Sequence, residues 1–260
     1  MERAARVGEM AVSQSAEWQR ELRTTARLGH RTWDFAGEGT LPLLDACEHL
    51  EPHGIKRGVT IGLDRQCHTL AGVLAAGPSQ SGEWVAIVGV EDMGFEAAAA
   101  MGLALQRCVW VPRPGAQWAT AVGALLEVTS IVIASPAPTG VRFDARRLRA
   151  VARERRSALV ALGDWMPGPD VRWSIASSCW SGLGTGFGAL ATRRLTVRAT
   201  GRGRHELPRE VELVVPDIDG AVRVSEQPQN QQSQKQQSQK QRSQEQGPAH
   251  LTRVDHAQAV

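Results

Sequence analysis

Residues 62–69, Gly-Leu-Asp-Arg-Gln-Cys-His-Thr, come nearest in this chain to a phosphate-binding motif. Against the pattern G-x-x-x-x-G-K-[ST], Gly62 and Thr69 match the first and last positions. Cys67 stands where the second glycine belongs, and His68 stands where the lysine belongs. That glycine lets backbone amides wrap a phosphate and the lysine supplies a permanent cation, whereas a neutral histidine does neither well. The segment therefore predicts a degenerate, inactive nucleotide loop.

Three further positions point the same way. Asp64 lies inside the loop, where a carboxylate repels a polyphosphate. A strand is predicted over residues 130–136, and Ala134 replaces the aspartate that would organise Mg²⁺ at its end. Glu91 follows another predicted strand but receives no catalytic role, because the lysine and the aspartate are both missing. We therefore predict no catalytic residue, no metal site and no cofactor, and we expect that the protein is not an enzyme.

A helix predicted over residues 143–155 carries a candidate binding surface. Five arginines fall at spacings of four and three residues and share one stripe: Arg142, Arg146, Arg149, Arg153 and Arg156. Neither nearby acidic residue, Asp144 or Glu154, falls on the stripe. Unpaired guanidinium groups in register would bind DNA phosphates or an acidic partner, whereas the commoner alternative is a solvated helix face. We expect that the fold does not depend on this stripe.

A glycine-rich segment, residues 182–188, invites a cofactor interpretation but does not fit one. Gly182, Gly184 and Gly186 alternate with other residues, which gives no G-x-G-x-x-G pattern, and a strand pattern rather than a helix follows. The segment predicts a hairpin or a loop, with DNA or partner binding by analogy alone.

The chain has eight tryptophans and no tyrosine. Trp165 and Trp180 stand beside predicted loops, where a large apolar face with a polar handle suits an interface. Four other tryptophans are predicted to be buried. Trp84, Trp110 and Trp173 fall in predicted strands, and Trp118 falls in a predicted helix.

Short apolar runs alternate with helical segments through the middle of the chain. Strands are predicted over residues 58–63, 83–90, 108–112, 130–136, 157–163 and 171–178, and helices over 68–77, 95–105, 115–128 and 143–155. This alternation is typical of a mostly parallel sheet with helices on both faces. Residues 193–203 and 209–220 alternate apolar and polar, which indicates antiparallel strands. The predicted fold class is α/β, with antiparallel strands at its C-terminal end.

The 260 residues divide into three predicted parts. Residues 1–40 are an extension with a helix at 14–28, residues 41–224 are the core, and residues 225–260, rich in Gln, Ser and Lys, are a disordered tail. The net charge of +3 argues against a wholesale polyelectrolyte binder, and the four cysteines show neither metal-ligand nor disulfide spacing. No signal peptide or membrane span is recognised, so we expect a cytoplasmic protein.

The serial order of these motifs resembles a RecA-like P-loop core, and more specifically the ATPase-degenerate ImuA-like proteins of actinobacteria. The resemblance spans residues 41–220, and five stretches carry it: LPLLDACEHL (41–50), GIKRGVTIGL (54–63), EWVAIVGVEDMGFEAAAAMGLAL (83–105), VPRPGAQWATAVGALLE (111–127) and the segment from WSGLGTGFGAL to TGRG (180–203).

This resemblance implies a non-catalytic adaptor in SOS-type DNA damage tolerance, meaning translesion synthesis and induced mutagenesis. It implies an ImuB-like Y-family polymerase relative as partner, an error-prone C-family polymerase reached indirectly, and nucleoid association when engaged. Weak binding of single-stranded DNA is a further expectation. Two alternatives stay open: a residual ATP-binding RecA-like ATPase or single-stranded-DNA-binding protein, and a SulA-like inhibitor of cell division. His68 and Ala134 argue against the ATPase, and a tubulin-like partner would favour the inhibitor.

Overall fold

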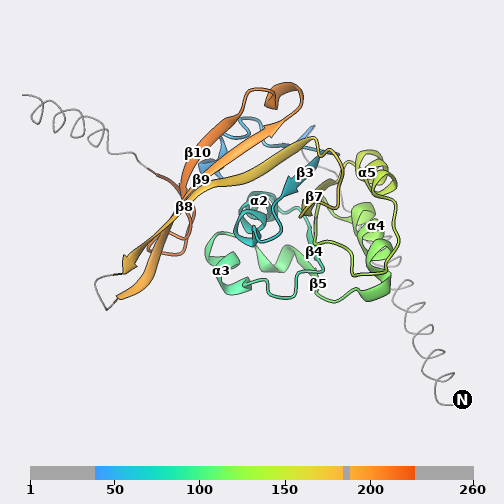
Figure 1. Cartoon of the computed structure of the whole chain (residues 1–260), viewed down its shortest axis with the longest axis horizontal. Helices are drawn as coiled ribbons and strands as arrows, with labels where there is room; N and C mark the ends of the chain where they lie inside the picture. Colours follow the sequence, from blue (N-terminus) through green and yellow to red (C-terminus); the bar gives the residue numbers. More distant parts are fainter. Residues whose placement is uncertain (1–38, 184–187, 226–260) are drawn as a thin grey trace, which may run out of the picture. The chain divides into compact units, whose positions relative to one another are not determined.

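The computed structural model of the chain describes residues 39–183 and 188–225 (Figure 1). Most of the predicted N-terminal extension, nearly all of the predicted tail, and Gly184 and Gly186 lie outside these residues, so the expectations for them stay predictions. In the described part of the chain, no helix has the length and apolar character needed to cross a membrane.

One nine-stranded sheet organises the described residues. From one edge to the other its strands are β11 (Arg223–Val224), β10 (Arg209–Val214), β9 (Gly188–Gly201), β8 (Val171–Leu183), β3 (Thr60–Leu63), β7 (Ala158–Leu162), β6 (Ile131–Ala134), β4 (Val85–Val88) and β5 (Cys108–Val111). The strands from β8 to β5 are parallel, whereas β8, β9, β10 and β11 pair antiparallel in turn. The prediction of an α/β fold with a mostly parallel sheet and C-terminal antiparallel strands is confirmed.

Helices cover both faces of the parallel part of the sheet (Figure 1). One hydrophobic cluster contains side chains of α2 (His68–Gln80) and α3 (Phe95–Ala100), and a second contains those of α4 (Trp118–Val128) and α5 (Ala145–Glu154). Along β6, Ile131 belongs to the first cluster and Val132 to the second, and every residue of the strand is buried. Burial on both faces explains why these strands read as continuous apolar runs in the sequence.

The helix predicted over residues 95–105 ends at Ala100, for a local reason. Gly102 has a φ of 105°, in the left-handed region that favours glycine. The Leu103 amide donates to the Ala98 carbonyl at 2.9 Å, and the Gly102 amide donates to the Ala99 carbonyl at 2.9 Å. These two bonds form a Schellman cap, which satisfies carbonyls at the helix end and turns the chain towards β5.

Several short elements are not predicted by the sequence patterns. They are β1 (Thr40–Leu41), which pairs antiparallel with β2 (Ile55–Lys56), the strand β11, and the 3₁₀ helices η1 (Asp45–Cys47), η2 (Leu105–Arg107) and η4 (Gly203–His205). The 3₁₀ helix η3 (Gly115–Gln117) forms the start of the helix predicted over residues 115–128.

The hairpin formed by β8 and β9 is longer than predicted. Only Val171, Arg172 and Trp173 of β8 pair with β3, whereas β8 pairs with β9 as far as Leu183. We call residues 176–183 and 188–194 the β8–β9 arm. All side chains from 176 to 183 are exposed, and Figure 1 shows this end of the hairpin extending away from the helices.

Candidate functional site

The predicted nucleotide loop is a tight turn at the carboxyl end of β3. The strand ends at Leu63, α2 begins at His68, and the Cys67 amide donates to the Asp64 carbonyl at 3.0 Å. A phosphate-binding loop needs several consecutive backbone amides arched around one point. Residues 64–67 are too few to form such an arch, because the turn leads directly from strand into helix.

Gly62 does not begin the loop, and that part of the prediction is wrong. It lies within β3, between Ala161 of β7 and Arg172 of β8, so sheet partners flank it on both sides. A Cβ atom at this position would lie only 2.9 Å from Cγ of Pro169. A glycine is therefore explained here by close packing and not by a bound phosphate.

Ala134, at which the sequence analysis noted the absence of a Mg²⁺-organising aspartate, is the last residue of β6. It is fully buried, and its carbonyl accepts a hydrogen bond from Nε1 of Trp165 at 3.2 Å. The Trp165 ring contacts Trp118 edge-on at 5.0 Å, and Phe143 completes the aromatic cluster. Trp165 is therefore half-buried in the second hydrophobic cluster, a placement that favours a packing role over the predicted interface role.

Charged side chains around the turn pair with one another. His68 Nδ1 lies 3.7 Å from an Asp92 carboxylate oxygen, an ion pair only when the histidine is protonated. Arg172 lies 3.6 Å from Asp64 and 2.7 Å from Asp164. The carboxylates are largely exposed, so each pair contributes little to stability. Two carboxylates therefore already hold Arg172.

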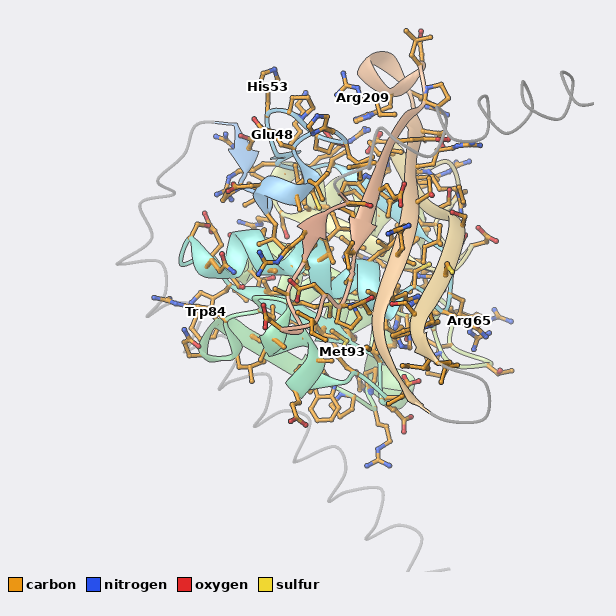
Figure 2. The ribbon with its side chains drawn as sticks, turned by 90° about the vertical axis from the view of Figure 1, so that its left-hand side faces the viewer. Glu48, His53, Arg65, Trp84, Met93 and Arg209 are labelled. Carbon is orange, nitrogen blue, oxygen red and sulfur yellow. The ribbon has the colours of Figure 1, made fainter. Side chains whose placement is uncertain are left out.

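Two other residues of the turn lack the properties of a reactive site. Burial, and then the charge of Asp64, raise the pKa of the Cys67 thiol, which disfavours the nucleophilic thiolate. Arg65 is exposed, and Figure 2 shows its side chain pointing outward at the side of the sheet.

Glu91 is exposed and lies 3.9 Å from Arg113. Among the described residues, no group of three His, Cys, Asp or Glu side chains is placed to hold a metal ion.

The arginine stripe is divided by an acidic residue from a distant part of the chain. Arg149 donates to Asp170, which directly precedes β8, and also to the Gly168 carbonyl at 2.9 Å. Arg153 lies 3.3 Å from the same carboxylate. The prediction that all five arginines are unpaired is therefore wrong. The sequence stripe misses this partner because Asp170 approaches α5 only through the parallel packing of β7, β3 and β8.

Asp170 also ties α5 to the start of β3. Its second oxygen accepts from the Thr60 amide at 2.9 Å and from the Thr60 hydroxyl at 2.7 Å. Burial by itself raises the pKa of Asp170, but the Thr60 hydrogen bonds and the Arg149 charge outweigh it and hold the pKa below its ordinary value. The expectation that the fold does not depend on the stripe stays a prediction, and Arg149 and Arg153 are the positions where these contacts bear on it.

The rest of the stripe is exposed. Arg142 and Arg146 are exposed, and so is Arg156, which lies beyond the helix end with a φ of 56°. These three form no ion pair with a described residue, nor do the neighbouring Arg147 and Arg155. Asp144 caps α5 by accepting from the Arg146 amide at 2.9 Å, so Arg142 lies before the helix and not on it as predicted. We call these five exposed arginines the α5 basic face.

Of the glycine-rich segment, Gly182 and Leu183 end β8 and Gly188 begins β9, and these strands pair antiparallel as a hairpin requires. Gly182 has a φ of 105°, and a Cβ there would lie 2.3 Å from the Ala189 carbonyl oxygen, so close strand approach explains this glycine. Trp180 is 42% exposed, and the Arg193 guanidinium stacks over its ring at 5.5 Å.

The remaining tryptophan predictions give mixed results. Trp118 and Trp173 are fully buried, as predicted. Trp110 is 43% exposed, so its predicted place in the core is wrong; β5 is the last strand of the sheet, and the ring rests edge-on against Phe95. Trp84 is half-buried beside Arg107.

The sequence analysis did not identify the polar contacts at the end of the sheet where the parallel strands begin, which is opposite to the turn at residues 64–67. Arg57 lies 2.5 Å from Glu83, whose other oxygen accepts from the Ser130 hydroxyl. His205 Nε2 lies 2.8 Å from Glu51, and both side chains are buried. The only sequence signal was the presence of charged residues just before strands, which does not identify their partners.

Residues 48–167 match the family model described as MT3502 N-terminal domain. The match includes the turn, Ala134 and α5, and it ends before the β8–β9 arm. No comparison links the chain to the ImuA-like or RecA families. No curated protein matches the chain.

Proposed function

We propose that this chain is a non-catalytic RecA-like adaptor in SOS-type DNA damage tolerance. Its partner in translesion synthesis is an ImuB-like Y-family polymerase relative, through which an error-prone C-family polymerase is reached. The identity of the partner rests on the sequence resemblance. The observation that carries the non-catalytic part is the replacement of a phosphate loop by the turn at residues 64–67.

Strand order supports the RecA-like part of the proposal. β3, which precedes the turn, lies inside the sheet between β7 and β8. The order β5-β4-β6-β7-β3-β8, continued by the antiparallel β9 and then β10, agrees with the order of RecA-type cores. A shared strand order supports a fold assignment only, so the function must come from the surfaces.

Three features of the carboxyl edge support an adaptor over an ATPase. The turn is too short to arch around a phosphate, Arg172 is held by two carboxylates, and Ala134 lies beneath Trp165. Each feature removes a different requirement of phosphoryl transfer, namely the backbone cradle, the free cation and the metal-binding carboxylate. Replacing any one residue would leave the other two requirements unmet.

The α5 basic face is the surface that we assign to the partner. Arg146 and Arg147 project from α5, whereas Arg142 precedes the helix and Arg155 and Arg156 follow its last residue. The helix is anchored by Leu148 and Ala152 in the second hydrophobic cluster and by Arg149 on Asp170. A rigid helix that presents unpaired guanidinium groups can bind carboxylates bidentately without a large ordering cost. The partner's contact surface is therefore expected to be acidic.

The test is direct binding between the full chain and an ImuB-like Y-family polymerase relative. Arg142→Glu with Arg146→Glu is expected to weaken binding about tenfold or more and to reduce its salt dependence, because two attractive charges become repulsive. The matched control, Arg65→Glu with Arg113→Glu, makes the same charge change at the carboxyl edge and is expected to leave affinity unchanged.

Each result has a clear interpretation. Equal affinities for the two double variants and the unmodified chain would overturn the assignment of the α5 basic face. Absence of binding by the unmodified chain would overturn the adaptor proposal itself. If the α5 variant instead loses binding to a single-stranded oligonucleotide, the face contacts nucleic acid, with affinity that falls as salt rises.

A further inference from the structure

The β8–β9 arm carries an open strand edge. β3 accompanies β8 only as far as Trp173, whereas β9 accompanies it to Leu183. On the side of β8 that faces away from β9, residues 174–183 pair with no described strand. Unpaired amides and carbonyls on such an edge are a template for another strand.

The middle of this edge is regular. Between two irregularities, at Ile175/Ser177 and Ser181/Leu183, β8 keeps an unbroken register with β9. The regular run extends from Ser177 to Ser181, and Cys179 is its central residue. A regular run offers evenly spaced hydrogen-bonding groups, whereas a bulge interrupts them.

The composition of the edge lacks the usual protection against pairing. Solvent-exposed edge strands commonly carry a charged side chain, most often lysine, or a proline. Residues 174–183, Ser-Ile-Ala-Ser-Ser-Cys-Trp-Ser-Gly-Leu, contain none of these. Trp180 and Leu183 are also 42% and 65% exposed, so apolar surface accompanies the open backbone.

The cations of the arm argue against nucleic acid as its ligand. Arg193 stacks on Trp180 and donates from Nε to the Ser178 hydroxyl at 2.9 Å. Arg194 lies 2.9 Å from Glu212 of β10. The cations near the edge are thus engaged, whereas binding to single-stranded nucleic acid needs a positively charged groove.

We propose that the β8 edge binds a second copy of this chain, with the two β8 strands antiparallel about a twofold axis at Cys179. An uncharged edge is self-complementary, because the twofold axis brings no like charges together. In this arrangement Cys179 lies opposite Cys179 of the partner copy, and Trp180 lies opposite Ser178 of the partner copy. The two Trp180 rings lie on the same face of the joined sheet, where each can cover part of the other.

The proposal does not depend on the proposed function, because it needs neither a polymerase nor DNA. The first measurement is the molar mass of the purified full chain by analytical ultracentrifugation over a wide concentration series under reducing conditions. We expect a monomer–dimer equilibrium. A monomer at every concentration overturns the proposal.

Charge at Cys179 tests the location of the interface. Cys179→Lys and Cys179→Glu place like charges opposite each other, so each alone is expected to weaken dimerisation about tenfold or more. An equimolar mixture of the two is expected to recover dimers, because opposite charges then face each other. A dimer that neither substitution weakens uses another surface, which overturns the proposal.

Two controls separate the edge from the hairpin. Cys179→Ser keeps a small uncharged side chain and is expected to dimerise as the unmodified chain does. Thr192→Lys adds a charge on β9, directly across from Ser181, and is expected to leave the dimer intact. If Thr192→Lys abolishes dimers while Cys179→Lys does not, the β9 edge is the interface and the assignment to β8 is wrong.

Hydrogen exchange and thiol oxidation test the register without a destabilising variant. Amides of residues 177–181 are expected to exchange more slowly as the concentration rises. Mild oxidation is expected to link two chains through Cys179, since Cys47 and Cys67 are buried and burial raises the pKa of Cys108 to about 11. Concentration-independent exchange throughout the arm overturns the proposal.

Discussion

Charged side chains are buried at one end of the parallel strands and exposed at the other. We call these ends the two edges of the parallel sheet. At the edge where strands begin, Arg57 is almost fully buried and lies 2.5 Å from Glu83. At the same edge Asp170 receives hydrogen bonds from Thr60 and Arg149. At the edge where strands end, Arg113 and Glu91 are exposed and lie 3.9 Å apart.

Among the described residues, the buried ionic contacts thus lie where the strands begin, and the exposed ones lie where the strands end. Open α/β sheets bind ligands beyond the carboxyl ends of their strands, where preorganised polar groups are needed. Here the short, buried contacts lie at the other edge, where they connect the starts of β3, β4, β6 and β8. Where the strands end, the ion pairs Arg113–Glu91 and Arg172–Asp64 are at the surface.

The largest effect that distinguishes the two edges is expected at Glu83. Glu83→Ala removes the carboxylate that lies against the buried Arg57 guanidinium and accepts from Ser130. Breaking a buried ion pair from one side is expected to lower the free energy of unfolding by about 3–5 kcal/mol, because a charge remains inside the protein. Urea denaturation of the two chains measures this difference.

Glu91→Ala is the matched control at the carboxyl edge. Its carboxylate is exposed and distant from its arginine, so the expected change is within about 0.5 kcal/mol. If the two substitutions lower the free energy of unfolding equally, the buried contacts where the strands begin contribute no more to stability than the exposed ones where the strands end.

A smaller effect is expected at Asp170, with a characteristic pH dependence. Asp170→Asn removes the charge that Arg149 and Thr60 stabilise, and the expected loss is about 2 kcal/mol at neutral pH. Because its pKa is lower in the folded chain than in the unfolded chain, the carboxylate stabilises the fold fully above about pH 4. That stabilisation is lost as the pH falls through the lowered pKa of the folded state.

The measurement is chemical denaturation of both chains at neutral and acidic pH. The difference in stability is expected to shrink on acidification, because both chains then carry an uncharged side chain at this position. Asp164→Asn, which changes an exposed carboxylate at the carboxyl edge, is the control. A difference that does not change with pH would mean that Asp170 acts through packing and not through its charge.

The sequence predicts the parallel sheet well, because a strand that is buried on both faces has an uninterrupted run of apolar residues. β4 and β6 are uninterrupted apolar runs, and both lie inside the sheet with every residue buried. β5 reads the same way, yet Trp110 is exposed because β5 has no strand beyond it. The position of a strand in the sheet depends on its neighbours, which its own sequence does not specify.

The features of the candidate site that depend on residue type could be predicted from the sequence. The features that depend on contacts between distant parts of the chain could not. The sequence itself shows that His68 and Ala134 stand where phosphoryl transfer would need a lysine and an aspartate. The place of Gly62 inside β3 is not, because strand ends are set by the pairing of β3 with β7 and β8. The partner of Arg149 and Arg153 was missed for a similar reason, since Asp170 joins them only after the sheet has formed.

The smallest expected effect concerns ATP at the carboxyl edge. A ligand that binds the folded chain must stabilise it, by about 2.7 kcal/mol at a concentration one hundred times its dissociation constant. Thermal unfolding with and without millimolar ATP and Mg²⁺ is expected to give the same midpoint. His68→Lys restores the loop cation but leaves the turn at residues 64–67 too short and Ala134 in place, so it is expected to restore neither stabilisation nor hydrolysis. A rise of several degrees with ATP in the unmodified chain would show that the carboxyl edge binds nucleotide. A rise only in His68→Lys would show instead that the cation, and not the length of the turn, was the missing element.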